Sequence, residues 1–110
     1  MSFSVVWTEY ALTRMEVLTD FIAAKSPIAA YRIIDDLFDR AAILGDQPEI
    51  GHALPTLNEP TIRVMYFGVY RLIYLVDHDA RCVSVLTAQH GKELPLDEDD
   101  LRKLLDNIDQ

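Results

Sequence analysis

The chain has 110 residues, of which half are hydrophobic, and carries a formal net charge of −8 from 10 basic and 18 acidic side chains. This length predicts a single domain, residues 1–110, that can bury its own core, and the composition excludes a disordered or low-complexity protein. The acidity argues against attraction to phosphates, which requires a clustered basic face, so we expect no direct specific binding of DNA.

The first predicted elements are a strand and a helix. Phe3–Trp7 is a short β-type run, and Thr8 stands where a helix N-cap belongs. Two apolar stripes follow at helical spacing. The first stripe contains Ala11, Met15, Leu18 and Ile22, and the second contains Tyr10, Val17 and Phe21. These stripes predict a helix that packs on two sides within its own domain, or a helix whose second stripe binds a partner.

A second helix is predicted to begin at Ser26-Pro27, with Ser as the N-cap and Pro in the first turn. Its apolar positions share one face and are Ala30, Ile34, Leu37, Ala41 and Leu44. Gly45 fits the position just after the helix, where glycine often takes a left-handed conformation. Residues 46–60 contain Pro48, Gly51, Pro55 and Pro60 and show no periodicity, which predicts a long surface loop.

Three β-rich runs, Thr61–Phe67, Val69–Val76 and Cys82–Ala88, are joined by short turns and so predict an antiparallel meander. Residues 97–108 begin with four acidic residues and continue with an apolar stripe, which predicts an acidic C-terminal helix. The predicted class is α+β: an N-terminal strand, a helical hairpin packed on a mainly antiparallel four-stranded sheet, and an extra C-terminal helix.

Membrane, metal and cofactor signatures are missing from the sequence. No apolar run approaches the roughly 20 residues of a membrane span, and the N-terminus has no signal-peptide pattern. Cys82 is the single cysteine, and no Cys/His cluster, P-loop or dinucleotide-binding glycine pattern occurs. We therefore expect a cytoplasmic protein that contacts no membrane and uses no metal and no cofactor.

Arg71 is the most unusual residue of the predicted sheet. Strand alternation places it on the same face as Ile73 and Leu75, within an apolar strand. A charged side chain in that position needs a polar partner or a path to water. A carboxylate or a loop carbonyl could provide a purely structural partner, and otherwise Arg71 is a candidate functional residue.

Three short motifs occur between residues 61 and 94. They are Ile62-Arg63-Val64, the string Tyr70-Arg71-Leu72-Ile73-Tyr74, and His90-Gly91-Lys92 at the end of the last strand. With the element order and the Pro48–Gly51 turn, they make residues 3–94 resemble the ParE/RelE superfamily of bacterial toxins from type II toxin–antitoxin modules, which includes plasmid stabilization proteins. The resemblance implies a RelE/ParE-like fold and a small growth-inhibiting toxin held silent by a cognate antitoxin encoded beside it.

The resemblance implies one of two activities. A RelE-like toxin cuts messenger RNA on the ribosome, whereas a ParE-like toxin poisons DNA gyrase and has no catalytic role. Metal-independent RNA cleavage needs a base for the 2′-hydroxyl, cations for the phosphate and an acid for the leaving oxygen. In a RelE-like protein the candidates for these roles would be Arg71, His90 and Arg63. His90 could instead only cap the end of its strand.

The charge distribution favours the ParE-like activity. Residues 61–95 contain only four basic side chains, and the net charge of −8 opposes docking on ribosomal RNA. We therefore predict a ParE-like toxin that is not an enzyme, with a RelE-like endoribonuclease or an inactive antitoxin-binding homologue as alternatives. In each case we expect the antitoxin to bury apolar positions such as Tyr10, Val17 and Phe21.

Overall fold

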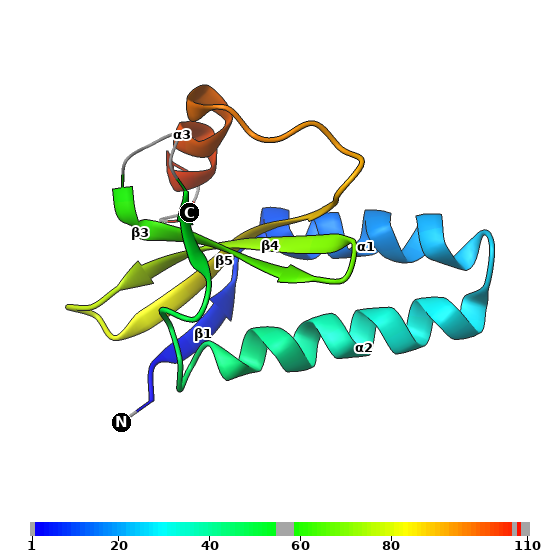
Figure 1. Cartoon of the computed structure of the whole chain (residues 1–110), viewed down its shortest axis with the longest axis horizontal. Helices are drawn as coiled ribbons and strands as arrows, with labels where there is room; N and C mark the ends of the chain where they lie inside the picture. Colours follow the sequence, from blue (N-terminus) through cyan, green and yellow to red (C-terminus); the bar gives the residue numbers. More distant parts are fainter. Residues whose placement is uncertain (1, 55–58, 107, 109–110) are drawn as a thin grey trace.

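A mixed β-sheet separates two helical layers in the computed structural model, which describes residues 2–54, 59–106 and 108 (Figure 1). The elements, in chain order, are β1 (Ser4–Trp7), α1 (Glu9–Ala23), α2 (Pro27–Ile43), β2 (His52–Leu54), β3 (Glu59–Phe67), β4 (Tyr70–Asp77), β5 (Cys82–His90) and α3 (Glu98–Asp106). The strand order across the sheet is β1-β5-β4-β3-β2. The predicted α+β class, the helical hairpin and the β3–β4–β5 meander are confirmed.

The predicted number of four strands is wrong, because the segment expected to be a loop contains β2. This strand pairs antiparallel with β3, with His52 opposite Val64 and Ala53 opposite Arg63. Three residues without alternation produce no strand pattern, so only the pairing with β3 defines β2. Residues 55–58 of the predicted loop lie outside the described residues.

The N-terminal strand is an edge strand that pairs in parallel with β5, in a register that sets Ser4 opposite Cys82 and Trp7 opposite Val85. Both predicted N-caps are confirmed, since Oγ1 of Thr8 accepts a hydrogen bond from the Ala11 N–H at 3.0 Å. In the same way, Oγ of Ser26 accepts one from the Ala29 N–H at 3.1 Å. Local sequence signals therefore set where both helices of the hairpin begin.

Gly45 follows α2 as predicted, but its φ is not positive, so a left-handed cap is not the reason for glycine here. The N–H of Phe3 donates to the Gly45 carbonyl at 2.6 Å, which brings the start of β1 against the end of α2. A Cβ on residue 45 would lie only 2.9 Å from the Phe3 carbonyl oxygen. Close approach of two backbones therefore explains this glycine.

Two apolar clusters lie on opposite faces of the sheet. The hairpin face, covered by α1 and α2, buries Ala11, Met15, Leu18, Leu37, Ala41, Leu44, Met65, Leu72, Tyr74, Val76, Val83, Val85 and Ala88. The α3 face, covered by α3, buries Ile62, Val64, Ile73, Leu86, Leu101 and Leu104. Figure 1 shows α3 and the α1–α2 hairpin on opposite sides of the sheet. No helix of the described residues is long and apolar enough to cross a membrane.

Candidate functional site

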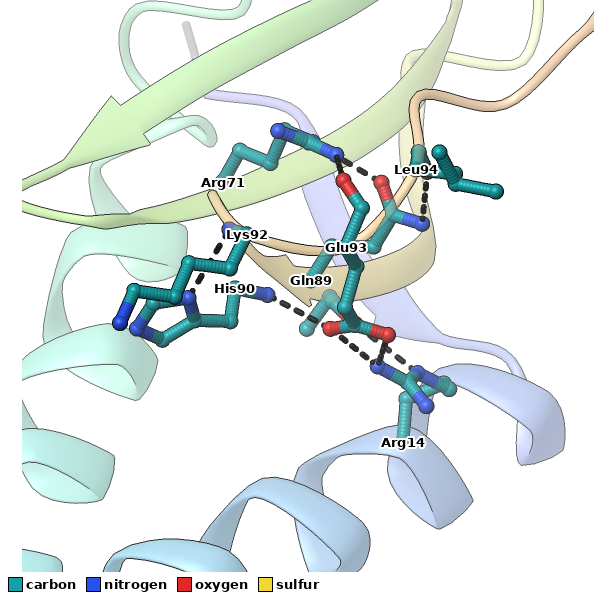
Figure 2. A network of polar contacts seen from close by, with 8 residues as sticks. Arg14, Arg71, Gln89, His90, Lys92, Glu93 and Leu94 are labelled. Atoms are coloured by element: carbon teal, nitrogen blue, oxygen red, sulfur yellow. Dashed lines mark hydrogen bonds and ion pairs between the residues drawn. The ribbon is translucent and has the colours of Figure 1, made fainter.

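The turn after β5 is held to the first helix by the carboxylate of Glu93 (Figure 2). Its two oxygens accept hydrogen bonds from Nη2 of Arg14 at 2.6 and 2.7 Å, and Oε2 also accepts one from the backbone N–H of His90 at 2.7 Å. Nε of Arg14 donates to the Ala88 carbonyl at 3.0 Å. Arg14 therefore ties α1 both to β5 and to the turn, and its charge is balanced by Glu93.

Arg71 holds the other side of the same turn. Its Nε donates to Oε1 of Gln89 at 2.9 Å, and its Nη2 donates to the backbone carbonyl of Glu93 at 3.0 Å. Gln89 lies directly opposite Arg71 in the β4–β5 ladder, and its Nε2 donates to the Leu94 carbonyl at 3.4 Å. The expected need for polar partners is confirmed, and the partners include the loop carbonyl that a structural role predicts.

A β-bulge in β5 decides the face on which His90 lies. Successive residues of β4 pair with Thr87 and then with Val85, so Leu86 is the extra residue between them. An extra residue reverses the alternation of the side chains that follow it. As a result, His90 lies on the hairpin face, whereas Gln89 lies on the α3 face beside Arg71.

The imidazole of His90 is packed between aromatic rings on the hairpin face. Its centroid lies 6.3 Å from that of Phe21 on α1 and 5.3 Å from that of Tyr70 on β4, both in edge-on geometry. Nδ1 accepts a hydrogen bond from the Lys92 N–H at 3.0 Å. This hydrogen bond and the two ring contacts hold the imidazole against the turn after β5.

The guanidinium of Arg63 is hydrogen-bonded to backbone carbonyls at the other end of the hairpin face. Its Nη1 donates to the Gly51 carbonyl at 2.6 Å and to the Glu49 carbonyl at 3.3 Å. The hydroxyl of Tyr74, the residue opposite Arg63 on β4, accepts a hydrogen bond from the Gly51 N–H at 2.9 Å. Burial raises the pKa of Tyr74, a shift that the Gly51 hydrogen bond and the nearby Arg63 charge reduce. Arg63 and Tyr74 together hold the turn that leads into β2.

The three residues considered for RNA cleavage do not converge in the structure. His90 lies on the hairpin face and Arg71 on the α3 face, so the sheet itself separates their side chains. Arg63 shares the hairpin face with His90 but is paired with Tyr74, whereas His90 is paired with Tyr70 at the far end of β4. An acid and the cations of one active site must reach one scissile phosphate, and this arrangement does not bring them to one point.

The three predicted partner-binding residues remain exposed on one side of α1: Tyr10 is 47%, Val17 48% and Phe21 57% exposed. Val17 and Phe21 line a pocket of about 410 Å³ between α1 and the turn after β5, together with His90. Tyr10 lies at the opposite end of α1, beside α3. The stripe is thus available to a partner, but only its second half faces the pocket.

Sequence reasoning did not single out Arg14, Lys25 or Glu93, which also line this pocket. Arg14 stands four residues after Tyr10 and three before Val17, so helical spacing alone could have placed it on the exposed stripe. The sequence gave no such signal for Glu93 or Lys25, because their places in the pocket depend on how the turn after β5 packs against α1. Among the residues that the structure describes, no group of three or more His, Cys, Asp or Glu side chains could hold a metal ion.

The fold is similar to that of several solved toxins. The toxin in the ParDE system of P. aeruginosa superposes with a TM-score of 0.67 at 16% identity over 83% of this chain and 98% of that chain. A double mutant of the E. coli toxin RelE in the free state gives 0.65 at 16% identity over 98% and 99% of the two chains. A chain of the toxin–antitoxin complex RelBE2 from Mycobacterium tuberculosis gives 0.62 at 22% identity over 82% and 99%. These similarities define a RelE/ParE-like fold.

Residues 5–95 match the family model of the ParE toxin of the type II toxin–antitoxin system parDE. The chain belongs to this family, and the resemblance to the ParE/RelE superfamily inferred from the sequence is confirmed. No curated protein sequence gave a match. Helix α3 lies outside the matched residues.

Proposed function

We propose that this type II toxin acts as a ParE-like inhibitor of DNA gyrase, without catalysing a reaction itself, in the bacterial cytoplasm. The observation that supports the proposal is that both candidate cations, Arg71 and Arg63, make hydrogen bonds within the protein. Nε and Nη2 of Arg71 hold the turn after β5, and Nη1 of Arg63 holds the turn before β2. They lie on opposite faces of the sheet, which favours structural roles for both guanidinium groups over a shared phosphate site.

The total charge supports the same proposal. A toxin that cuts RNA on the ribosome must approach a dense array of phosphates, and a chain of net charge −8 is repelled by them at long range. Inhibition of a protein target by surface contact carries no such requirement.

A ribosome-dependent endoribonuclease is the second candidate, and one observation favours it. His90 lines a pocket together with Lys25 and Lys92, so a potential proton donor lies beside two cations. In that case the nuclease site would be this pocket and not the three residues singled out from the sequence. The third hypothesis is an inactive homologue that only binds antitoxin.

The test is to add the purified chain to gyrase and, in parallel, to induce it in a bacterial host while messenger RNA is mapped. We expect reduced supercoiling, accumulation of cleaved DNA–gyrase complexes, filamentous cells and intact transcripts. Unchanged gyrase activity together with ribosomal cuts that vanish in His90→Ala, but persist in the exposed-helix control Arg32→Ala, would establish the nuclease. Normal growth and unchanged gyrase activity would leave only the inactive homologue.

A cognate antitoxin is the second partner in this proposal. It binds a surface of this chain that includes the exposed stripe of Tyr10, Val17 and Phe21. A segment that covers these side chains gains the burial of three large apolar groups that the isolated chain leaves in water. The stripe continues past Arg14, whose charge is balanced by Glu93, so Arg14 itself adds no unpaired charge to the stripe.

Introducing a charge into the stripe should break this complex. We expect Val17→Glu to weaken antitoxin binding by about 30-fold or more, because it replaces an apolar contact with a charged side chain that loses its hydration when the partner covers it. Leu12→Glu is the matched control, since residue 12 is similarly exposed at 43% but lies on a different side of α1. Calorimetric titration of each folded variant with the antitoxin measures the difference. Equal affinities for the two variants would remove the stripe from the interface.

A further inference from the structure

The pocket between α1 and the turn after β5 has an apolar floor and a cationic rim. The floor is formed by Val17, Leu18 and Phe21, of which Leu18 is buried and the other two are half-exposed. The His90 ring closes one side, edge-on to Phe21. A branched or aromatic side chain would therefore find apolar contacts on two sides of this space of about 410 Å³.

The charges at the pocket do not cancel. Arg14 and Glu93 neutralise each other at 2.6 Å, which leaves Lys25 and Lys92 as the uncompensated charges among the lining residues. The whole chain contains three lysines, and two of them line this one pocket in a protein of net charge −8. The ammonium of Lys25 lies 5.6 Å from the centroid of the Phe21 ring, so the charge borders directly on the apolar floor.

We propose that this pocket binds a segment of a partner protein in which an aromatic or branched apolar side chain stands next to a carboxylate. The apolar side chain inserts between Val17, Phe21 and His90, and the carboxylate pairs with Lys25 and Lys92. Identifying the antitoxin as the protein that carries this segment rests on the proposed function; the chemistry of the pocket does not.

Charge favours a peptide over a nucleic acid as the occupant. A strand of RNA needs a row of cations that follows its phosphates, whereas this pocket presents two ammonium groups over an apolar floor. A peptide with one or two carboxylates also meets much less repulsion from an acidic protein than a polyanion does. The pocket is therefore complementary to an acidic apolar segment.

The experiment titrates the ¹⁵N-labelled full chain with a capped hexapeptide that has a Leu-Phe pair flanked by Glu, and with its twin in which Gln replaces each Glu. We expect the acidic peptide to shift the amide signals of Val17, Phe21, His90 and Lys92, and to bind about tenfold more tightly than its twin at low salt. The double variant Lys25→Glu/Lys92→Glu should lose about tenfold in affinity. The control Arg102→Glu/Lys103→Glu makes the same change in total charge on α3 and should stay within about twofold of the wild type.

Three results would overturn the proposal. These are equal binding of the two peptides, equal loss of affinity in both double variants, and signal shifts confined to another surface. Tighter binding of a single-stranded RNA hexamer at the same four residues would assign the pocket to nucleic acid instead. None of these measurements depends on toxicity, so absence of growth inhibition would refute the proposed function and leave the peptide result standing.

Discussion

Truncation of Leu101 to alanine is expected to lower the free energy of unfolding by about 2–5 kcal/mol, the range for a fully buried leucine. Leu101 is 0% exposed and packs with Ile62 and Leu86, which are also 0% exposed, on the α3 face. Alanine is the best helix former, so the loss would come from the cavity and not from the helix itself. Urea unfolding followed by circular dichroism measures it.

Leu105→Ala is the matched control, because Leu105 belongs to the same helix but is only partly buried against the same cluster. Its expected cost is about 1 kcal/mol. Equal and small costs for the two variants would mean that α3 does not remain on the sheet in solution. The comparison is informative because α3 lies beyond residues 5–95, the part of the chain that matches the toxin family.

Replacement of Gly51 by alanine is expected to cost about 2–3 kcal/mol, as overpacking of a close-packed site does. A Cβ at this position would lie 2.6 Å from the Val64 carbonyl oxygen and 2.7 Å from the Tyr74 hydroxyl. Neither neighbour can retreat easily, since Val64 is in the middle of β3 and the Tyr74 ring is fully buried. A shift of these neighbours would also disturb the hydrogen bond that Arg63 donates to the Gly51 carbonyl and the one that Tyr74 accepts from the Gly51 N–H, which hold the turn before β2.

Gly68→Ala separates this steric effect from the usual cost of replacing glycine. Gly68 has a φ of +58° at the first position of the β3–β4 turn, and a Cβ there would meet nothing within 4 Å. Only the left-handed conformation is penalised, at about 1 kcal/mol. If thermal unfolding shows Gly51→Ala to be no worse than Gly68→Ala, the contacts around Gly51 are looser than the structure indicates.

The helical hairpin could be predicted in detail because its signals are local. Thr8 and Ser26 are caps in the structure as the sequence indicated, and the stripe of Ala11, Met15 and Leu18 is buried as its spacing predicted. Each of these features depends on residues three or four positions apart in the chain. The alternation in β4 was equally reliable, with Leu72 on the hairpin face and Ile73 on the α3 face.

The candidate site could be predicted only in part. Helical spacing correctly left Val17 and Phe21 outside the first buried stripe, and Arg71 has the polar partners that its position demanded. The grouping of Arg71, His90 and Arg63 was a hypothesis about side chains on three strands, and the structure places them apart. Whether any of them has a functional role stays a prediction.

Two non-local features account for what the sequence could not reveal. Strand β2 exists because three residues with no pattern of their own find backbone partners on β3. The bulge at Leu86 belongs to the pairing of β5 with β4, two segments separated by a turn, and it sends His90 to the hairpin face. A one-residue shift in pairing moves every later side chain to the opposite face.

By itself, the sequence determined the α+β class, both helices of the hairpin, the meander and the membership of a toxin superfamily, because these depend on short-range periodicity and on motif order. Tertiary structure decided the fifth strand, the separation of the cationic residues by the sheet and the pocket in which Lys25 meets Lys92. These features arise from contacts between different segments of the chain, from the pairing of His52 with Val64 to the ion pair of Arg14 with Glu93, and the energies of such contacts are not encoded in either segment alone.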